Sequence, residues 1–104
     1  MNVALYYLDG CPSCQPALRN LKTALRLEQW PEDVKMVRVA NASEARRHRL
    51  IGSPTIRIDG ADIEGPVAEV RGYAFGCRVY TDGTGTAGWP SVEQIRQALQ
   101  RAWP

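Results

Sequence analysis

The sequence has few cysteines and almost no net charge. It carries 3 cysteines in 104 residues, and its 13 basic and 11 acidic residues leave a net charge of +2. A small and odd number of cysteines excludes the disulfide framework of a small secreted domain. A charge this close to neutrality supplies no strong field for attracting nucleic acid or an anionic membrane. We therefore expect neither of these as a partner.

Long hydrophobic runs are also missing. The longest apolar run covers residues 3–8, whereas a membrane helix needs roughly 20 such residues. No charged segment or small-residue cleavage site of a secretory signal precedes this run. We expect a cytoplasmic protein, in a reducing compartment where cysteines serve redox chemistry, bind metal or are simply buried. The length and the hydrophobic content of 44% fit a single domain over residues 1–104, and we expect a monomer.

Hydrophobic spacing in the first half of the chain predicts two strands and two helices. The apolar run up to Leu8 suits a central strand that is buried on both faces. Apolar residues then recur every three or four positions from Cys14 to Leu25, which is the spacing of one helix face. A second strand is expected over 34–39, and Asn41 begins the capping pattern of a short, arginine-rich helix.

The second half predicts a hairpin, a further strand and a final helix. Residues 55–58 alternate between apolar and polar and run into an Asp-Gly hairpin turn. Residues 77–80 alternate again, and the glycine-rich segment 82–88 is expected to be a flexible connection. Ser91 caps a last helix whose core face includes Trp103. This order predicts an α/β fold in which a parallel βαβ unit and an antiparallel hairpin form a central mixed sheet with helices on both faces.

A Cys-x-x-Cys motif lies between the first predicted strand and the first predicted helix, as Cys11-Pro12-Ser13-Cys14. A thiolate at a helix N-terminus is stabilised by unpaired backbone N–H groups and by the positive end of the helix dipole. Cys11 is therefore the expected nucleophile. Cys14 lies in line with the buried helix face, so it is the more shielded thiol and would resolve a mixed disulfide. Pro12 helps to fix the turn.

The Ser53-Pro54 pair lies just ahead of the third predicted strand. A CxxC that closes the first strand, together with such an X-Pro pair, resembles the thioredoxin/glutaredoxin superfamily, and the element order is that of a thioredoxin-like fold. The resemblance implies that the Ser53–Pro54 bond is cis and that Pro54 packs against the CxxC. It also implies that the backbone of Ser53 is free to pair with a bound peptide or thiol substrate. With Pro12 and Ser13, these residues form the expected substrate-binding surface.

Three longer segments carry a closer resemblance that covers nearly the whole chain. Residues 7–12, 52–60 and 71–80 are similar to the corresponding parts of small bacterial thioredoxin-like proteins of undefined role, some of which carry labels connected with alkylmercury lyase. Members of that group often replace the second cysteine of the CxxC. Because Cys14 is present here, the resemblance implies redox activity of the dithiol.

These features predict a small cytosolic thiol–disulfide oxidoreductase. The redox-active disulfide Cys11–Cys14 would be its only cofactor, and its substrate would be a protein or small-molecule thiol or disulfide. One alternative is a binding protein in which the same thiols capture a soft metal such as mercury. Another is a non-catalytic thioredoxin-like module. Structural zinc is a further reading of the CxxC, although only Cys77 and His48 remain to complete four ligands.

Three residues outside the CxxC have both a structural and a chemical reading. Cys77 shares a predicted strand face with Phe75 and Val79, which favours burial as a small hydrophobic residue. The sharper hypothesis makes Cys77 a third thiol that converges on the CxxC and contributes to soft-metal capture. His48 is expected on a solvated helix face rather than as a ligand. Asp9 could assist proton transfer, or it could simply form the turn that ends the first strand.

Overall fold

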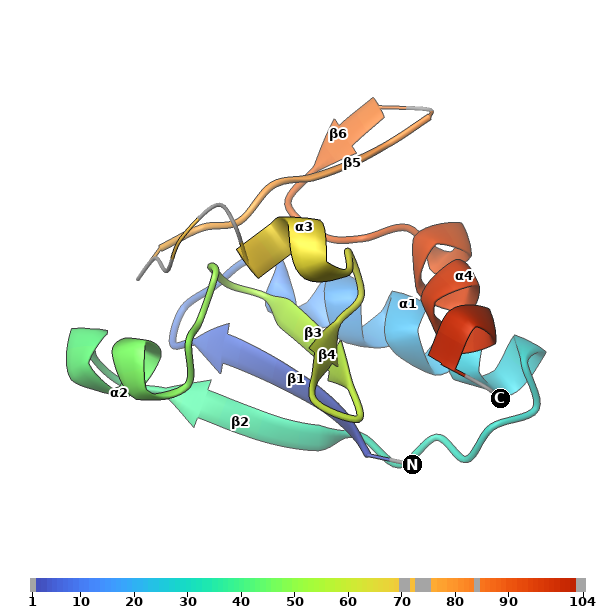
Figure 1. Cartoon of the computed structure of the whole chain (residues 1–104), viewed down its shortest axis with the longest axis horizontal. Helices are drawn as coiled ribbons and strands as arrows, with labels where there is room; N and C mark the ends of the chain where they lie inside the picture. The colour runs from blue at the N-terminus through green and yellow to red at the C-terminus, as the bar shows by residue number, and fades with distance from the viewer. Residues whose placement is uncertain (1, 70–71, 73–75, 84, 103–104) are drawn as a thin grey trace.

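A four-stranded mixed sheet forms the centre of the protein (Figure 1). The computed structural model describes residues 2–69, 72, 76–83 and 85–102. In chain order, the strands of this sheet are β1 (Val3–Leu8), β2 (Lys35–Val39), β3 (Thr55–Ile58) and β4 (Ala61–Asp62). β1 lies between a parallel neighbour, β2, and an antiparallel neighbour, β3, and β4 pairs antiparallel with β3. The predicted α/β architecture with a mixed sheet is confirmed.

Helices lie on both faces of this sheet. The long helices α1 (Cys14–Leu27) and α4 (Val92–Ala102) pack side by side on one face, and the short helix α2 (Ala42–Arg47) lies on the other (Figure 1). The side chains of β1 alternate between these layers: Leu5 joins the cluster formed with α1 and α4, whereas Tyr6 contacts the cluster that includes Ala45 of α2. A further short helix, α3 (Pro66–Glu69), follows β4.

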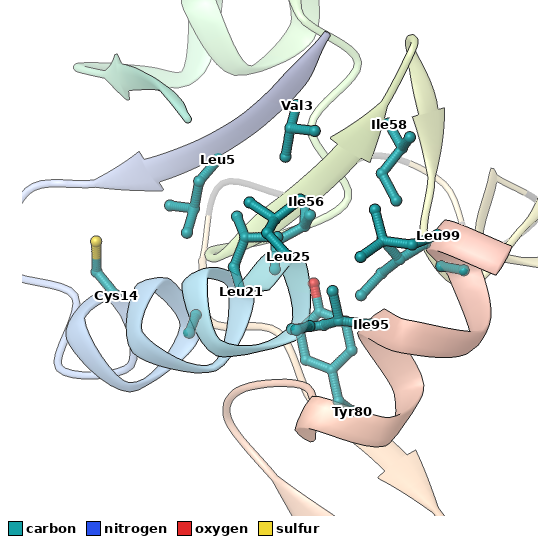
Figure 2. Packing of buried hydrophobic residues seen from close by; sticks show 14 residues of the cluster. Val3, Leu5, Cys14, Leu21, Leu25, Ile56, Ile58, Tyr80, Ile95 and Leu99 are labelled. Carbon is teal, nitrogen blue, oxygen red and sulfur yellow. The ribbon is translucent and has the colours of Figure 1, made fainter. Parts of the chain in front are cut away.

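The main core is formed where α1 and α4 meet β1 and β3 (Figure 2). Burial of a large aliphatic side chain contributes about 1.5–3 kcal/mol relative to leaving it exposed. The predicted spacing on α1 is largely confirmed, because Cys14, Leu21 and Leu25 are all buried. Trp103, predicted for the same core, lies outside the described residues. The fully buried aliphatic side chains include Leu5, Leu21, Leu25, Ile56, Ile95 and Leu99.

The helix caps follow the predicted polar patterns. The Asn41 side chain accepts a hydrogen bond from the Glu44 N–H at 2.9 Å. At the start of α4, the Ser91 Oγ accepts from the Gln94 N–H at 3.1 Å, and the Gln94 Oε1 accepts from the Ser91 N–H at 3.0 Å. These reciprocal bonds satisfy backbone donors that a helix N-terminus otherwise leaves unpaired. No helix within the described ranges is long and apolar enough to cross a membrane.

A separate hairpin lies away from the four-stranded sheet (Figure 1) and corrects the prediction for residues 77–88. It consists of β5 (Tyr80–Asp82) and β6 (Gly85–Ala87). The predicted strand therefore begins only at Tyr80, and part of the expected flexible connection is a paired strand. The turn is closed by the Asp82 side chain, which accepts a hydrogen bond from the Gly85 N–H at 3.1 Å. The glycine-rich composition predicted a flexible connection, but hydrogen-bonded pairing with β5 holds residues 85–87 in a strand.

Candidate functional site

The CxxC forms a tight turn between β1 and α1, as predicted. The Cys11 N–H donates to the Leu8 carbonyl at 3.2 Å, and the Cys14 N–H donates to the Cys11 carbonyl at 3.3 Å. Ser13 is the N-cap of α1, and Cys14 is the first residue of the helix. Pro12, between the cysteines, is exposed. The backbone therefore places Cys11 just before the first turn of α1, and Cys14 within it.

The two thiols of the CxxC differ in environment. Cys11 is half-buried, whereas Cys14 is 9% exposed and borders the main core, as Figure 2 shows at the start of α1. Burial raises the pKa of the Cys14 thiol, and the negative charge that Cys11 carries as a thiolate raises it further. Cys14 therefore holds its proton at a pH where an ordinary exposed thiol begins to ionise. All three cysteines of the chain carry free thiols.

The Ser53-Pro54 segment and this turn both form hydrogen bonds with the backbone of Leu8. The Leu8 N–H donates to the Ser53 Oγ at 3.0 Å, and the Leu8 carbonyl accepts from the Cys11 N–H. Two segments far apart in the sequence thus meet at the last residue of β1. Ser53 and Pro54 are buried, and the bond between them is cis, as predicted.

The prediction that the Ser53 backbone is free for substrate is wrong. The Ser53 N–H donates to the Gly76 carbonyl at 2.8 Å, and the Ser53 carbonyl accepts from the Arg78 N–H at 3.0 Å. These two bonds make a parallel bridge between Ser53 and Cys77. A segment of the same chain therefore occupies the backbone groups that were expected to bind substrate. We refer to residues 76–80 as the strap.

A buried arginine holds the strap in place. The Arg78 guanidinium donates two hydrogen bonds to the Asp62 carboxylate, at 2.7 and 2.8 Å, and one to Glu64 at 2.7 Å. A further bond reaches the Thr55 hydroxyl at 3.1 Å. Burial by itself lowers the pKa of Arg78, but the hydrogen bond to Asp62, the Tyr80 and Asp62 charges and the bond to Glu64 together raise it, so the group stays charged. Such paired, hydrogen-bonded charges are the form in which a buried arginine is stable.

Close backbone packing adds a second contact to the strap. Gly52 has a φ of +150°, and a Cβ built on it would lie 2.8 Å from the Cβ of Arg78. Only glycine combines that conformation with so close an approach. The Tyr80 hydroxyl then donates to the Pro54 carbonyl at 2.5 Å, and the Tyr80 side chain is buried in the main core. The strap is thus attached to both residues that flank Ser53.

Cys77 is exposed, which overturns the prediction that it is a buried packing residue. Its predicted neighbour Val79 is 56% exposed, and Phe75 lies outside the described residues. The alternation over 77–80 is real, but the buried face carries Arg78 and Tyr80 rather than the two smaller residues. An error of one position in the phase of an alternating segment exchanges its inner and outer faces. The polar partners of Arg78 explain why a charged residue can lie on the inner face.

The three-thiol form of the soft-metal hypothesis needs Cys77 near the CxxC. Throughout the part of the chain that the structure describes, no three His, Cys, Asp or Glu side chains are grouped closely enough to hold a metal ion. Cys11, Cys14 and Cys77 are all described residues. The structure therefore does not assemble the three-thiol site.

The residue that follows β6 lies against the CxxC. A Cβ built on Gly88 would collide with the Ser13 Oγ, so the backbone at Gly88 lies directly against the CxxC spacer. The chain from Gly76 to Gly88 thus contacts the Ser53-Pro54 segment at one end and Ser13 at the other. Sequence reasoning missed this enclosure because short glycine-rich pairing leaves little pattern in the sequence.

The two remaining candidate residues have structural contacts. His48 is half-buried, with its ring centroid 5.5 Å from that of Tyr6, rather than fully solvated as expected. Asp9 is exposed and accepts a hydrogen bond of 2.7 Å from the Arg38 Nε. This bond, and then the charge of Asp9, raise the pKa of Arg38. An ion pair at the surface therefore involves Asp9, in addition to its place in the turn.

The candidate site combines the two unequal thiols of the CxxC, the buried Ser53-Pro54 segment and the strap that pairs with the backbone of Ser53. Comparisons with protein-family models, with curated proteins and with solved structures each found no match to the chain.

Proposed function

We propose that this chain is a thiol–disulfide oxidoreductase with a thioredoxin-like fold, in which Cys11 is the nucleophile and Cys14 the resolving thiol. The observation that carries the proposal is the difference between the two thiols: Cys11 is partly accessible just before α1, and Cys14 is buried within its first turn with a raised pKa. A dithiol reductant needs two unequal thiols, because one sulfur must attack the substrate disulfide while the other stays protonated until the mixed disulfide has formed.

The proposed reaction uses the two thiols in turn. The Cys11 thiolate attacks one sulfur of a substrate disulfide, forms a mixed disulfide with it and releases the other half of the substrate as a thiolate. Cys14 then loses its proton and attacks the Cys11 sulfur, which releases the second half of the substrate as a thiolate. The substrate gains two electrons, and the protein is left with a Cys11–Cys14 disulfide. An external thiol such as dithiothreitol returns the protein to its dithiol form.

The arrangement of elements supports the fold assignment within this proposal. The parallel pair of β1 and β2, joined through α1, is combined with the antiparallel pair of β3 and β4, and the CxxC and the proline segment meet at the end of β1. Placing reactive side chains at the end of a central strand gives them a rigid support.

Reduction of bis(2-hydroxyethyl) disulfide by dithiothreitol, with and without the protein, tests the proposal. We expect catalysis by the wild type and by Cys77→Ser, and none by Cys11→Ser. Cys14→Ser, reduced, freed of dithiothreitol and then given the disulfide alone, should accumulate a mixed disulfide with half of the substrate, which mass spectrometry detects as a mass increase on the peptide that contains Cys11. Cys77→Ser is the matched control, since it removes a thiol that is exposed and outside the CxxC. Absence of catalysis by the reduced wild type would refute the proposed function.

A further inference from the structure

We infer that the site takes low-molecular-weight disulfides and does not bind extended polypeptides along the Ser53 edge, because the strap already occupies that edge. This inference rests on the proposed function and specifies its class of substrate. An extended peptide that docks beside a reactive thiol gains affinity mainly through main-chain hydrogen bonds to an exposed strand edge. At this edge, the groups that would pair with such a peptide are the N–H and the carbonyl of Ser53. The N–H is bonded to the Gly76 carbonyl, and the carbonyl is bonded to the Arg78 N–H.

A competing peptide would first have to displace the strap. Displacement breaks the two bonds to Ser53 and separates Arg78 from Asp62 and Glu64. The Arg78 and Asp62 side chains are each 2% exposed, so separating them leaves a buried charge without its partner. An unpaired buried charge is among the least favourable states in a protein interior. A peptide offering two backbone hydrogen bonds cannot compensate for that loss.

The thiol itself stays accessible while the strap is in place. Cys11 is half-buried rather than buried, although the strap lies at Ser53 and Gly88 lies against Ser13. A small disulfide needs only to bring one sulfur in line with the Cys11 thiolate. It does not need the backbone of Ser53. With the strap in place, an extended backbone on either side of the substrate sulfur therefore gains no binding advantage.

Two probes with the same leaving group test the inference. One is the mixed disulfide of N-acetylcysteine amide with 5-thio-2-nitrobenzoate, and the other carries the same mixed disulfide on a cysteine in the middle of a short extended peptide. In both, the Cys11 thiolate attacks the cysteine sulfur and releases the coloured nitrothiobenzoate anion, which is followed by stopped-flow absorbance. Pairing with Ser53 would add two hydrogen bonds, and it would therefore accelerate the reaction of the peptide probe by about tenfold or more at low probe concentration.

We expect the wild type to react with the two probes at similar rates. Each rate should be well above that of the same probe with free N-acetylcysteine amide as the attacking thiol. A peptide rate at least tenfold above that of the small probe would overturn the inference and leave the proposed function intact. If both probes react no faster with the protein than with the free thiol, the proposed function fails instead. The two failures are therefore distinguishable in a single experiment.

Releasing the strap should give the peptide probe an advantage over the small probe. Arg78→Met removes the guanidinium that binds Asp62 and Glu64 and leaves the buried Asp62 carboxylate without that partner, so it weakens the hold on the strap. In this variant, we expect the peptide probe to gain on the small probe. Tyr80→Phe, which removes the hydrogen bond to the Pro54 carbonyl, should shift the ratio less and in the same direction. Arg96→Met is the control, because it breaks the ion pair between Arg96 of α4 and Glu28, the C-cap residue of α1, and removes no contact of the strap. A folded Arg78→Met variant with an unchanged ratio would show that the strap does not control access.

Discussion

The buried ion pair of the strap can be tested through stability as well as through selectivity. Replacing Arg78 with methionine keeps a long side chain but removes the guanidinium. Asp62 then loses both of its charge-assisted hydrogen bonds, and Glu64 and the Thr55 hydroxyl each lose one. Because the Asp62 side chain is only 2% exposed, water cannot replace the lost donors without local opening of the structure.

The size of the effect follows from this burial. Breaking a buried pair by removing one partner costs about 3–5 kcal/mol, a large share of the roughly 5–15 kcal/mol by which a domain of ordinary stability is folded. Replacing both partners with apolar residues removes the uncompensated charge, so Arg78→Met with Asp62→Leu should recover most of the loss. Arg96→Met breaks a pair that is partly exposed, so its effect should be much smaller than that of Arg78→Met.

Urea unfolding followed by far-ultraviolet circular dichroism measures these differences. The two single variants at positions 62 and 78 and the double variant form a double-mutant cycle with the wild type, and the cycle isolates the coupling between the two residues. We expect Arg78→Met to be the least stable member of the comparison. The reasoning is refuted if Arg78→Met is no less stable than Arg96→Met, or if the effects at 62 and 78 simply add.

Three further predictions concern the cysteines and the packing of the strap. Burial, and then the charge of Cys11, raise the pKa of Cys14 above the ordinary value of 9.0, so limiting iodoacetamide near neutral pH should label Cys11 before Cys14, and Cys14 should stay unreactive until the pH exceeds that value; labelling of Cys14 ahead of Cys11 in a peptide map would contradict this. Cys77 is exposed, so Cys77→Ala should change the free energy of unfolding by no more than about 0.5 kcal/mol, and a loss above about 1 kcal/mol would restore a packing role. Gly52→Ala places a Cβ 2.8 Å from the Cβ of Arg78 at a φ of +150° and should destabilise the protein by about 1–3 kcal/mol; unchanged thermal unfolding would show that the backbone relaxes there.

Local patterns predicted those parts of the fold that local interactions determine. The position of α1, the caps at Asn41 and Ser91 and the CxxC at the end of β1 all follow from spacing or side-chain chemistry within a few residues. The cis bond before Pro54 followed from a resemblance and is present. Each of these features depends on residues that are close together in the sequence.

The strap was missed because its position depends on partners far along the chain. Alternation over 77–80 indicates a period of two residues but not which face is buried. That choice depends on Asp62 and Glu64, which lie 16 and 14 residues before Arg78. An arginine on an inner face is unfavourable until those carboxylates are placed. The error at Cys77 and the error at the Ser53 backbone therefore have one cause.

The backbone of Leu8 limits how far the two halves of the site can move apart. The Leu8 N–H donates to the Ser53 Oγ and the Leu8 carbonyl accepts from the Cys11 N–H, so both segments are held to the same residue of β1. Leu8 ends a strand that has a neighbour on each side, and it is paired there with Val39 of β2. A perturbation that unfolds the β5–β6 hairpin would therefore leave the spacing between the Ser53-Pro54 segment and the Cys11 thiol unchanged. A perturbation that shifts β1 would move both together. The alignment of the site is a property of the sheet rather than of its loops.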